Sequence, residues 1–276
     1  MLTFPNAKIN IGLNIIEKRA DGFHNIESVF YPVEWCDVLE IIPSQEKEVK
    51  FQSSGLAIPG NENSNLCLKA WHLLKSHILQ PPIIHLHKVI PMGAGLGGGS
   101  ADGAFTLKML NEVYDLKLNN DKLQDYARQL GSDCAFFIEN RPVFCYGKGD
   151  QFEDFSLDLR GKYIVLINPD IHISTAEAYS GVVPCKPKIS LKDGLKQNIT
   201  EWKETIKNDF ERNLLLKYPA IANVKAYLYQ SGAIYASMTG SGSTLYGIFD
   251  KEDECRTVNL KDKFPNFALW QGFIRN

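Results

Sequence analysis

A run of glycines in the first half of the chain constrains the fold more than any other stretch. From Pro91 to Phe105 the sequence reads PMGAGLGGGSADGAF, with five glycines among the seven residues 93–99. So many glycines lose too much conformational entropy to form a core strand or helix, so we expect a loop whose backbone approaches something closely. Residues 83–90 read as a strand, and residues 101–114 carry apolar side chains at helical spacing. The run therefore predicts a strand, a glycine loop and a helix with Ser100 as its N-cap.

This order is typical of a phosphate-binding loop, because free N–H groups and the positive end of a helix dipole converge where side chains are absent. The Walker pattern does not fit, since no lysine follows the last glycine. Gly93, Gly95 and Gly98 match the dinucleotide pattern GxGxxG, but the next segment, 121–130, has the pattern of a helix rather than of the required strand. A glycine-rich turn without a ligand is the remaining alternative. It is disfavoured because its glycines would cost entropy without compensating contacts.

Composition limits the class of protein. The 276 residues are 44% hydrophobic and 22% charged, as in an ordinary globular protein, and we expect two domains, residues 1–155 and 156–276. A net charge of -2 argues against a nucleic-acid partner bound by phosphate neutralisation. The N-terminus lacks the pattern of a signal peptide and no apolar run reaches membrane-spanning length, so we expect a cytoplasmic protein without a membrane partner.

Cysteine and histidine spacing gives no metal signature. The six cysteines are scattered without a CxxC pair, which favours buried thiols over disulfides or zinc ligands. His85 and His87 would face one way on a strand. No third ligand lies nearby in sequence, so an ordinary surface strand is favoured over a metal site.

Three further segments carry candidate functional side chains. In the strand 8–15, apolar and polar residues alternate, and the polar face with Lys8 and Asn10 suits a ligand better than solvent, although an edge strand is the alternative. A turn at Asp21 and Gly22 places Phe23 and His24 beside the polar end of that strand. There the two side chains either recognise a ring or close a hairpin. In GSDCAFFIEN, Asp133 precedes a short apolar helix, where an aspartate is usually an N-cap.

The remaining pattern predicts an α+β sandwich of ferredoxin-like type in the second half of the chain. We expect helix caps at Asn65 and Ser174, a helix from 120 or 121 to a left-handed Gly131, and a hairpin around Gly147 to Gly149. Further strands are expected at 38–42, 163–167, 233–238, 244–249 and 267–274, and further helices at 200–216, 219–231 and 251–260.

Four motifs occur in one order: AKINIGLNIIEKRADGFHNIESVF, PMGAGLGGGSAD, GSDCAFF and MTGSGSTLYGIF. Together they resemble the superfamily of galactokinase, homoserine kinase, mevalonate kinase and phosphomevalonate kinase, the GHMP kinases. The first motif resembles the branch that phosphorylates 4-diphosphocytidyl-2-C-methylerythritol. The resemblance covers essentially the whole chain. It implies a two-domain α+β GHMP kinase fold with a ribosomal-protein-like N-terminal half and a C-terminal ferredoxin-like α/β sandwich.

The resemblance also implies a reaction. ATP would phosphorylate the 2-hydroxyl of the methylerythritol moiety in the non-mevalonate route to isoprenoid precursors, with Asp133 as general base and Lys8 as its cationic partner. Mg²⁺ would be held mainly by phosphate oxygens and water, with Ser100 nearby. The ATP-binding loop would comprise Pro91, Met92, Gly93, Ala94, Gly95, Leu96, Gly97, Gly98, Gly99, Ser100 and Ala101.

The same resemblance assigns substrate contacts, with Phe23 stacking on the cytosine and His24 bonding its edge. The expected contacts are Asn10, Phe23, His24, Thr175, Gly240, Ser241 and Gly242. Some residues depart from the pattern: Phe23 replaces a tyrosine, Ala101 a serine, and Cys134 and Ala135 an aliphatic residue and a proline. None of these changes removes a catalytic group. We expect a monomer or weak homodimer.

Other functions fit the sequence less well. A non-catalytic nucleotide sensor would not need both Lys8 and Asp133, and an RNA-binding protein would carry more basic charge. Among enzymes, a homoserine or mevalonate kinase is disfavoured by the run of residues 22–24 that follows Asp21.

Overall fold

The chain forms two compact units, each assembled from separate stretches of sequence. The computed structural model describes residues 1–251 and 260–275. Unit 1 contains Met1–Lys8, Glu34–Met92 and Gly97–Arg141. Unit 2 contains Ile9–Val33, Gly93–Leu96 and Pro142–Asn276. These units follow contacts rather than chain order, and the division into residues 1–155 and 156–276 stays a prediction.

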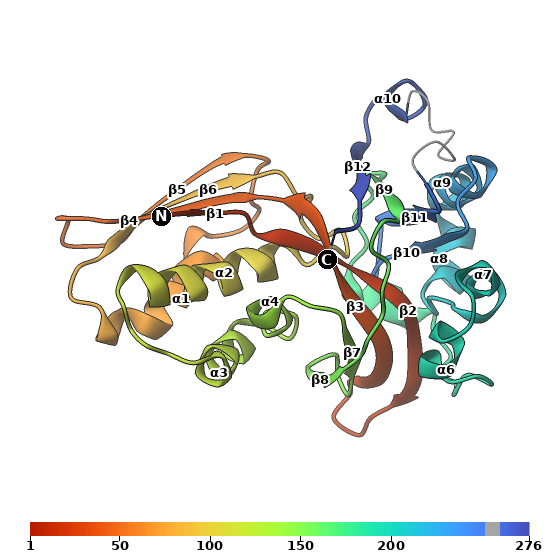
Figure 1. The fold of residues 1–276 in the computed structure, drawn as a ribbon, viewed down its shortest axis with the longest axis horizontal. Coiled ribbons are helices and arrows are strands. Elements are labelled where there is room, and N and C mark those ends of the chain that lie inside the picture. The colour runs from red at the N-terminus through yellow and green to blue at the C-terminus, as the bar shows by residue number, and fades with distance from the viewer. Residues whose placement is uncertain (252–259, 276) are drawn as a thin grey trace. The chain divides into compact units, whose positions relative to one another are not determined.

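Unit 1 is a sheet covered by helices. The strand order is β1-β4-β6-β5, with β5 parallel to β6 and the other pairs antiparallel. The strands are β1 (Leu2–Thr3), β4 (Val38–Pro43), β5 (Lys50–Gly55) and β6 (Pro82–Lys88). The helices are α1 (Leu66–Leu74), α2 (Gly98–Val113), α3 (Asn120–Leu130) and α4 (Phe136–Glu139). Two short 3₁₀ turns flank α1, Glu62–Ser64 and Lys75–His77. Helix α2 packs against both α1 and β4, so it lies on one face of the sheet (Figure 1).

Most sequence predictions in unit 1 are confirmed. The strands predicted around 38–42 and 83–90 are β4 and β6, and the Asn65 side chain caps α1 by accepting a hydrogen bond from the Cys67 N–H. The helix predicted from residue 120 is α3. Strand β5 was not predicted, because its sequence KFQSSG is polar. It lies at the edge of the sheet, where most of its side chains are exposed.

Two local predictions in unit 1 are wrong, and one alternative is excluded. Ser100 is not the N-cap of α2, because the helix begins at Gly98 and Gly97 occupies the cap position with a φ of 71°. Gly131 is not left-handed, since its φ of 170° is extended backbone. The alternative reading of Asp133 as a helix cap is excluded, because α4 begins at Phe136 and the cap position is Ala135, without a side-chain hydrogen bond.

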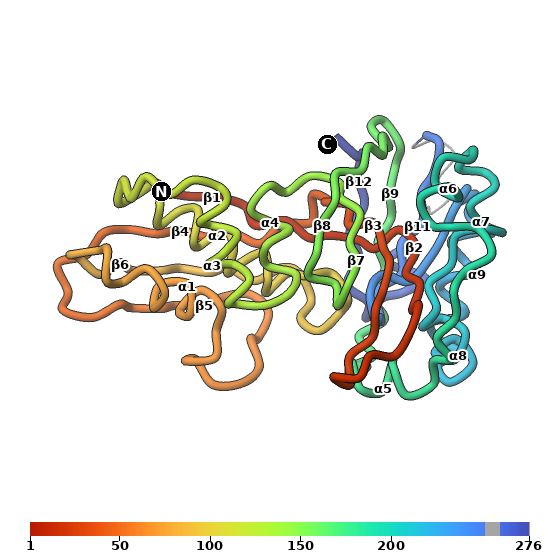
Figure 2. Tube along the Cα trace, turned by 90° about the horizontal axis from the view of Figure 1, so that it is seen from below, coloured from red at the N-terminus to blue at the C-terminus, as the bar shows by residue number. Residues whose placement is uncertain are grey.

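Unit 2 is built around two four-stranded sheets. One has the order β10-β11-β9-β12, all antiparallel. The other has the order β2-β3-β7-β8, and most of β2 and β3 belongs to this unit (Figure 2). The strands of the first sheet are β9 (Tyr163–Asn168), β10 (Tyr235–Met238), β11 (Leu245–Phe249) and β12 (Ala268–Phe273). Those of the second are β2 (Asn6–Lys18), β3 (His24–Cys36), β7 (Val143–Tyr146) and β8 (Gln151–Asp154).

Helices cover the first of these sheets and complete the predicted α/β sandwich. Helix α9 packs on β10 and β11, and α8 packs on α9 (Figure 1). The helices are α5 (Thr175–Ser180), α6 (Leu191–Leu195), α7 (Trp202–Thr205), α8 (Glu211–Lys217), α9 (Pro219–Gln230) and α10 (Leu260–Lys263), and a 3₁₀ turn, Ile199–Glu201, precedes α7. The buried core joins Val165 and Ile167 of β9 with Val224 and Leu228 of α9.

The later sequence predictions are mostly confirmed. The predicted strands and the hairpin at 147–149 form, and Ser174 caps α5 by accepting from the Glu177 N–H. The single helix predicted over 200–216 is wrong: it is interrupted before α8, where the Asn208 amide donates to the carbonyl oxygens of Met238 and Gly240. Most of the helix predicted at 251–260 lies outside the described residues.

The cysteines fit the expectation of buried thiols only in part. Cys67, Cys134 and Cys145 are buried, Cys36 is half-buried and Cys185 is exposed. Cys255 lies outside the described residues. Across residues 1–251 and 260–275, no helix has both the length and the apolar character needed to cross a bilayer.

Candidate active site

An ion pair in unit 1 joins the two residues predicted to be catalytic. The Lys8 Nζ lies 3.4 Å from the Asp133 Oδ2, although the two residues are far apart in sequence. The Lys8 side chain is 4% exposed and that of Asp133 is 30% exposed. A buried ammonium therefore stands behind a carboxylate that solvent or a substrate hydroxyl can reach. The polar face of β2 is not a solvated edge at Lys8.

The first turn of α2 packs against this pair. A Cβ at Gly97 would lie 3.2 Å from the Cε of Lys8 and 3.1 Å from the ring of Phe137, so a side chain there would push on the Lys8 stem. The backbone there is also left-handed, with a φ of 71°. The pair is thus held directly beside the helix start that was predicted to bind phosphate.

The turn that carries Asp133 is tied to the same helix start. Cys134 is fully buried, its thiol is hydrogen-bonded to Ser100, and burial raises its pKa to about 12. The Cys134 N–H also donates to the Gly131 carbonyl. A neutral, buried thiol is a packing group rather than a nucleophile. Ser100 lies in the first turn of α2, where its hydroxyl is next to the predicted phosphate site.

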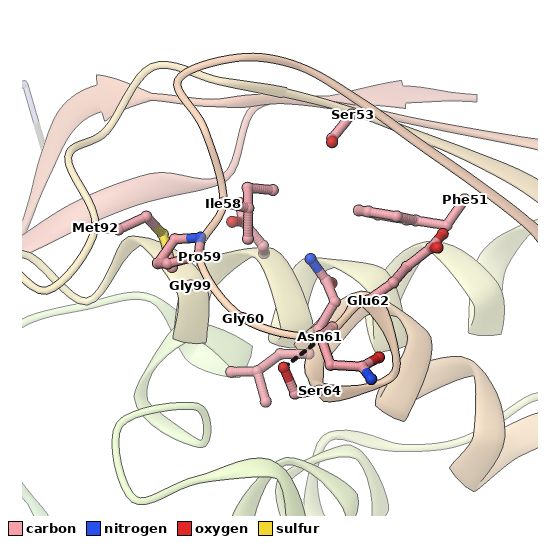
Figure 3. A pocket seen from close by; sticks show the side chains of 13 residues that line it. Phe51, Ser53, Ile58, Pro59, Gly60, Asn61, Glu62, Ser64, Met92 and Gly99 are labelled. Carbon is pink, nitrogen blue, oxygen red and sulfur yellow. Dashed lines mark hydrogen bonds between the residues drawn. The ribbon is translucent and has the colours of Figure 1, made fainter.

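A pocket in unit 1 opens beside the first turn of α2. The sequence did not predict it. It has a volume of about 370 Å³ and combines apolar side chains with amide and hydroxyl groups. Figure 3 shows Phe51, Ile58 and Met92 around it, with Asn61 and Glu62 on the loop before α1. The lining residues are Phe51, Ser53, Ile58, Pro59, Gly60, Asn61, Glu62, Ser64, Asn65, Leu66, Met92, Gly99 and Asp102. The loop GLAIPGNENSN has no motif that would have revealed this pocket, because the contribution of Phe51 depends on the unpredicted strand β5.

In unit 2, the middle of the glycine loop packs on the turn TGSGS. The Thr239 hydroxyl donates to the Gly95 carbonyl at 3.0 Å, and the Thr244 N–H donates to the Ala94 carbonyl. A Cβ at Gly95 would lie 2.1 Å from the Thr239 carbonyl oxygen. Gly240 lies against the same loop, since its Cβ would be 3.2 Å from the Gly95 Cα. The second glycine turn therefore supports the first through backbone contact.

Asn10 is buried in the same part of unit 2, with 2% of its surface exposed. Its N–H donates to the Thr239 hydroxyl, its side-chain amide donates to Ser28, and the Tyr246 hydroxyl donates to its carbonyl oxygen. The structure thus places Asn10 as a support of the TGSGS turn. Its predicted contact with substrate stays a prediction.

Phe23 and His24 lie together at the turn between β2 and β3. The Phe23 ring is 59% exposed, and the Lys148 Nζ lies 5.1 Å from its centroid. The His24 ring stacks on the Tyr179 ring at 4.7 Å, with an interplanar angle of 21°. Burial and the nearby Lys18 lower the pKa of His24, which keeps the imidazole neutral near pH 7. Tyr179 is a partner that the sequence did not single out.

The other predicted contacts in unit 2 lie on two segments. Thr175 is exposed at the first turn of α5, while Gly240 and Ser241 belong to the TGSGS turn. Gly242 is buried, and a Cβ there would lie 2.7 Å from the Met238 sulfur. His172 was not predicted, yet its ring lies about 3.7 Å from the position of a Cβ on Gly93.

Comparisons with known proteins identify the family of the chain. The family model for the GHMP kinases N terminal domain matches residues 65–147, and that for the GHMP kinases C terminal matches residues 191–258. A 4-diphosphocytidyl-2-C-methyl-D-erythritol kinase of Cytophaga hutchinsonii is 54% identical over 92% of this chain and 94% of its own. The chain belongs to the 4-diphosphocytidyl-2-C-methyl-D-erythritol kinase family.

Further members of this kinase family show the same likeness. The protein of Bacteroides fragilis with this name is 48% identical over 96% of the chain and 97% of its own length. The crystal structure of a 4-(cytidine 5'-diphospho)-2C-methyl-D-erythritol kinase superposes with a TM-score of 0.85 and 26% identity, covering both chains completely. The two-domain α+β fold of the GHMP kinases, predicted from the sequence, is confirmed, and the chain is a small-molecule kinase.

Proposed function

We propose that this kinase transfers the γ-phosphoryl group of ATP to the 2-hydroxyl of 4-diphosphocytidyl-2-C-methyl-D-erythritol, giving the 2-phosphate and ADP. This reaction belongs to the non-mevalonate route to isoprenoid precursors. The observation that carries the proposal is the pair of a buried Lys8 and an accessible Asp133 beside the start of α2. A protein that only bound nucleotide would not need such a pair, and a 54% identical relative bears the name of this kinase.

Asp133 takes the role of general base. A tertiary alcohol is a poor nucleophile until its proton is removed, and a partly exposed carboxylate can accept that proton. The Lys8 ammonium stabilises negative charge that develops on the acceptor oxygen. Because phosphoryl transfer depends mainly on positioning and electrostatics, these two groups orient the hydroxyl while the loop holds the donor.

ATP occupies the predicted loop and the pocket beside it. The phosphates lie at the N-terminus of α2, where unpaired N–H groups and the helix dipole favour anions. The adenosine lies in the 370 Å³ pocket, which is large enough for a small molecule and lined by an aromatic ring, aliphatic groups and the amides of Asn61 and Asn65. Met92 and Gly99 line this pocket and belong to the loop, so one ligand can reach both.

Mg²⁺ would be coordinated at this site mainly by phosphate oxygens of ATP and by water. Within residues 1–251 and 260–275, no group of three or more histidine, cysteine or acidic side chains could hold a metal ion. The Ser100 hydroxyl is the side-chain oxygen placed at the helix start, and it would add one ligand to those of ATP and water. When bound, the ion neutralises charge on the β- and γ-phosphates.

The cytosine lies at the turn between β2 and β3. The Phe23 ring is exposed enough to stack on a base, and Tyr179 fixes the orientation of the His24 ring. A neutral imidazole can donate one hydrogen bond and accept another, as the edge of cytosine requires. Phe23 keeps the stacking function of the usual tyrosine and lacks its hydroxyl contact.

The experiment that tests the function is ADP release from ATP and Mg²⁺ with different acceptors. We expect turnover with 4-diphosphocytidyl-2-C-methyl-D-erythritol and none above background with homoserine, mevalonate or no acceptor. Binding of ATP without turnover of any acceptor would instead support a nucleotide sensor.

The role of Asp133 is tested in the same assay. Asp133→Asn should lower kcat by at least about a hundredfold while ATP affinity stays within twofold, because the amide keeps the shape and cannot accept the proton. A matched control is Asp125→Asn on the exposed face of α3, which should leave kcat unchanged. Near-normal turnover of Asp133→Asn would contradict the assignment of Asp133 as general base and leave it a structural role.

A further inference from the structure

A buried ion cluster in unit 1 contains Asp37 and Lys88, which have no role assigned above, and Asp102, which also lines the 370 Å³ pocket. The Lys88 ammonium contacts the Asp37 carboxylate and lies 2.8 Å from the Asp102 Oδ2. The side chains of Lys88 and Asp37 are 0% exposed and that of Asp102 is 5% exposed. Three ionisable groups are thus removed from water in one place.

The cluster is costly for stability alone. Desolvation of each ion costs several kcal/mol, and well-packed apolar residues of similar volume often stabilise a core as well or better. Burial acts to lower the pKa of Lys88, but Asp102 and Asp37 outweigh it and hold this pKa above its ordinary value. The lysine therefore stays charged. Apolar side chains of the same total volume would fill this space at a lower desolvation cost. We therefore ask what the location of the cluster contributes.

That position is at both ends of the phosphate loop. On the entry side, the Asp37 Oδ1 accepts hydrogen bonds from the N–H groups of Val89 at 2.5 Å and Ile90 at 2.8 Å, the residues directly before Pro91. Asp37 itself is fixed, because its N–H donates to the Pro5 carbonyl. The backbone that leads into the loop is therefore attached to Asp37.

On the exit side, the cluster reaches the first turns of α2. Asp102 is one turn past Gly98, and its carbonyl oxygen accepts from the Thr106 hydroxyl. The Lys88 Nζ lies 3.0 Å from where a Cβ at Gly98 would be, so the ammonium lies directly under the first residue of the helix. Lys88 thereby ties the helix start to the strand end that Asp37 holds.

We propose that Asp37, Lys88 and Asp102 are positioning residues that hold the two ends of the phosphate loop at the separation at which its N–H groups fit the polyphosphate of ATP. This inference rests on the proposed function, since it takes polyphosphate as the ligand of the loop. The three side chains act through the backbone and do not contact the reacting atoms.

The sign of a mutational effect separates positioning from electrostatics. Asp37→Asn and Asp102→Asn each remove a negative charge close to an anion site, so an electrostatic role alone predicts tighter binding of polyphosphate. Loss of positioning predicts weaker binding. Binding of ATP and of inorganic triphosphate is measured by calorimetry at pH 8, alongside KM for both substrates, kcat and the thermal midpoint.

We expect both variants to bind ATP and triphosphate about tenfold more weakly, with KM for the acceptor changed less than twofold. The control Leu110→Ala removes a buried side chain from the far end of α2, where it lowers the midpoint without touching the loop. Its affinity for ATP should equal that of the wild type. Asp102→Glu, which keeps a carboxylate at this position, should lose less affinity than Asp102→Asn.

Unchanged or tighter binding in folded Asp37→Asn and Asp102→Asn would overturn the inference, as would an equal loss in Leu110→Ala. If either variant fails to fold, the other decides the matter, together with Asp102→Glu. A wild type that binds ATP but phosphorylates no acceptor would contradict the proposed function and leave this inference to be judged by affinity. A wild type that binds neither ATP nor triphosphate would contradict both.

Discussion

His24 illustrates how the environment of a single residue sets its chemistry. The sequence placed an aromatic residue and a histidine beside a turn and left open whether they bind a ring or close a hairpin. The structure adds Tyr179, whose ring stacks on the imidazole, and a pKa lowered by burial and by Lys18. A histidine that is neutral at pH 7 and fixed in orientation suits recognition of an uncharged base.

This arrangement predicts a pH dependence. The folded-state pKa of His24 lies below its ordinary value of 6.5, so the neutral form persists at pH 6.5 and the imidazolium forms only at lower pH. As the pH falls through this lowered pKa, KM for the cytidylated acceptor should rise, by up to about tenfold per pH unit, because the protonated ring can no longer accept a hydrogen bond.

The measurement is KM for the acceptor between pH 5 and 8 in the wild type and in His24→Gln. The glutamine variant does not titrate, so its profile reports any ionisation of the substrate itself. KM for ATP serves as the control for the rest of the protein. Parallel profiles in the two proteins would contradict the assignment of His24 to the cytosine.

At the scale of elements, the glycine loop shows what the sequence could predict and what it could not. Its place between a strand and a helix was predicted correctly, because glycine content and apolar periodicity are local signals. The start of α2 was misplaced by about one turn, since Gly97 takes a positive φ and the following glycines are already helical. The cap moved from Ser100 to Gly97, and Ser100 became a first-turn hydroxyl.

The same distinction holds for other elements. Apolar strands such as β9 and β11 were predicted from their own residues. The polar edge strand β5 was missed because it is formed by pairing with β6, which its polar sequence does not indicate. The interruption before α8 was missed because Asn208 bonds to a turn about 30 residues later. Candidate site residues were found by motif. The contacts of Tyr179 and Asp37, and the hydrogen bond between Cys134 and Ser100, join residues far apart in sequence that local patterns do not connect.

Contact between the two glycine turns in unit 2 predicts a large effect of one methyl group. Gly95→Ala places a Cβ 2.1 Å from the Thr239 carbonyl at a φ of 78°. Gly161→Ala is a matched control, since its φ of 80° is similar and no atom lies within 4 Å of the added Cβ. Both variants should lose about 1 kcal/mol through the left-handed backbone.

Gly95→Ala should lose about 2 to 3 kcal/mol more, because backbone at the TGSGS turn must move, and its KM for ATP should rise as well. Urea unfolding gives the free energies, and steady-state kinetics gives KM. Equal losses in the two alanine variants would show that the loop accommodates the methyl group and that its close packing is not needed.

For the molecule as a whole, the two units are interleaved along the chain. The backbone passes between them at Lys8/Ile9, Val33/Glu34, Met92/Gly93, Leu96/Gly97 and Arg141/Pro142. No single cut therefore separates one unit from the other. Sequence order alone does not reveal such an arrangement, because it depends on long-range pairs such as Lys8 with Asp133.

Interleaving predicts that the protein unfolds in one transition and that a ligand of one unit stabilises the whole chain. ATP at a hundred times its Kd should add about 2.7 kcal/mol to the free energy of unfolding. With an unfolding entropy of about 2.1 cal/mol/K per residue, a chain of 276 residues should show a midpoint raised by about 5 °C. Scanning calorimetry with and without ATP measures this shift. Two transitions, of which ATP moves only one, would contradict the prediction, because the unit that binds the nucleotide would then unfold independently of the other despite the five connections between them.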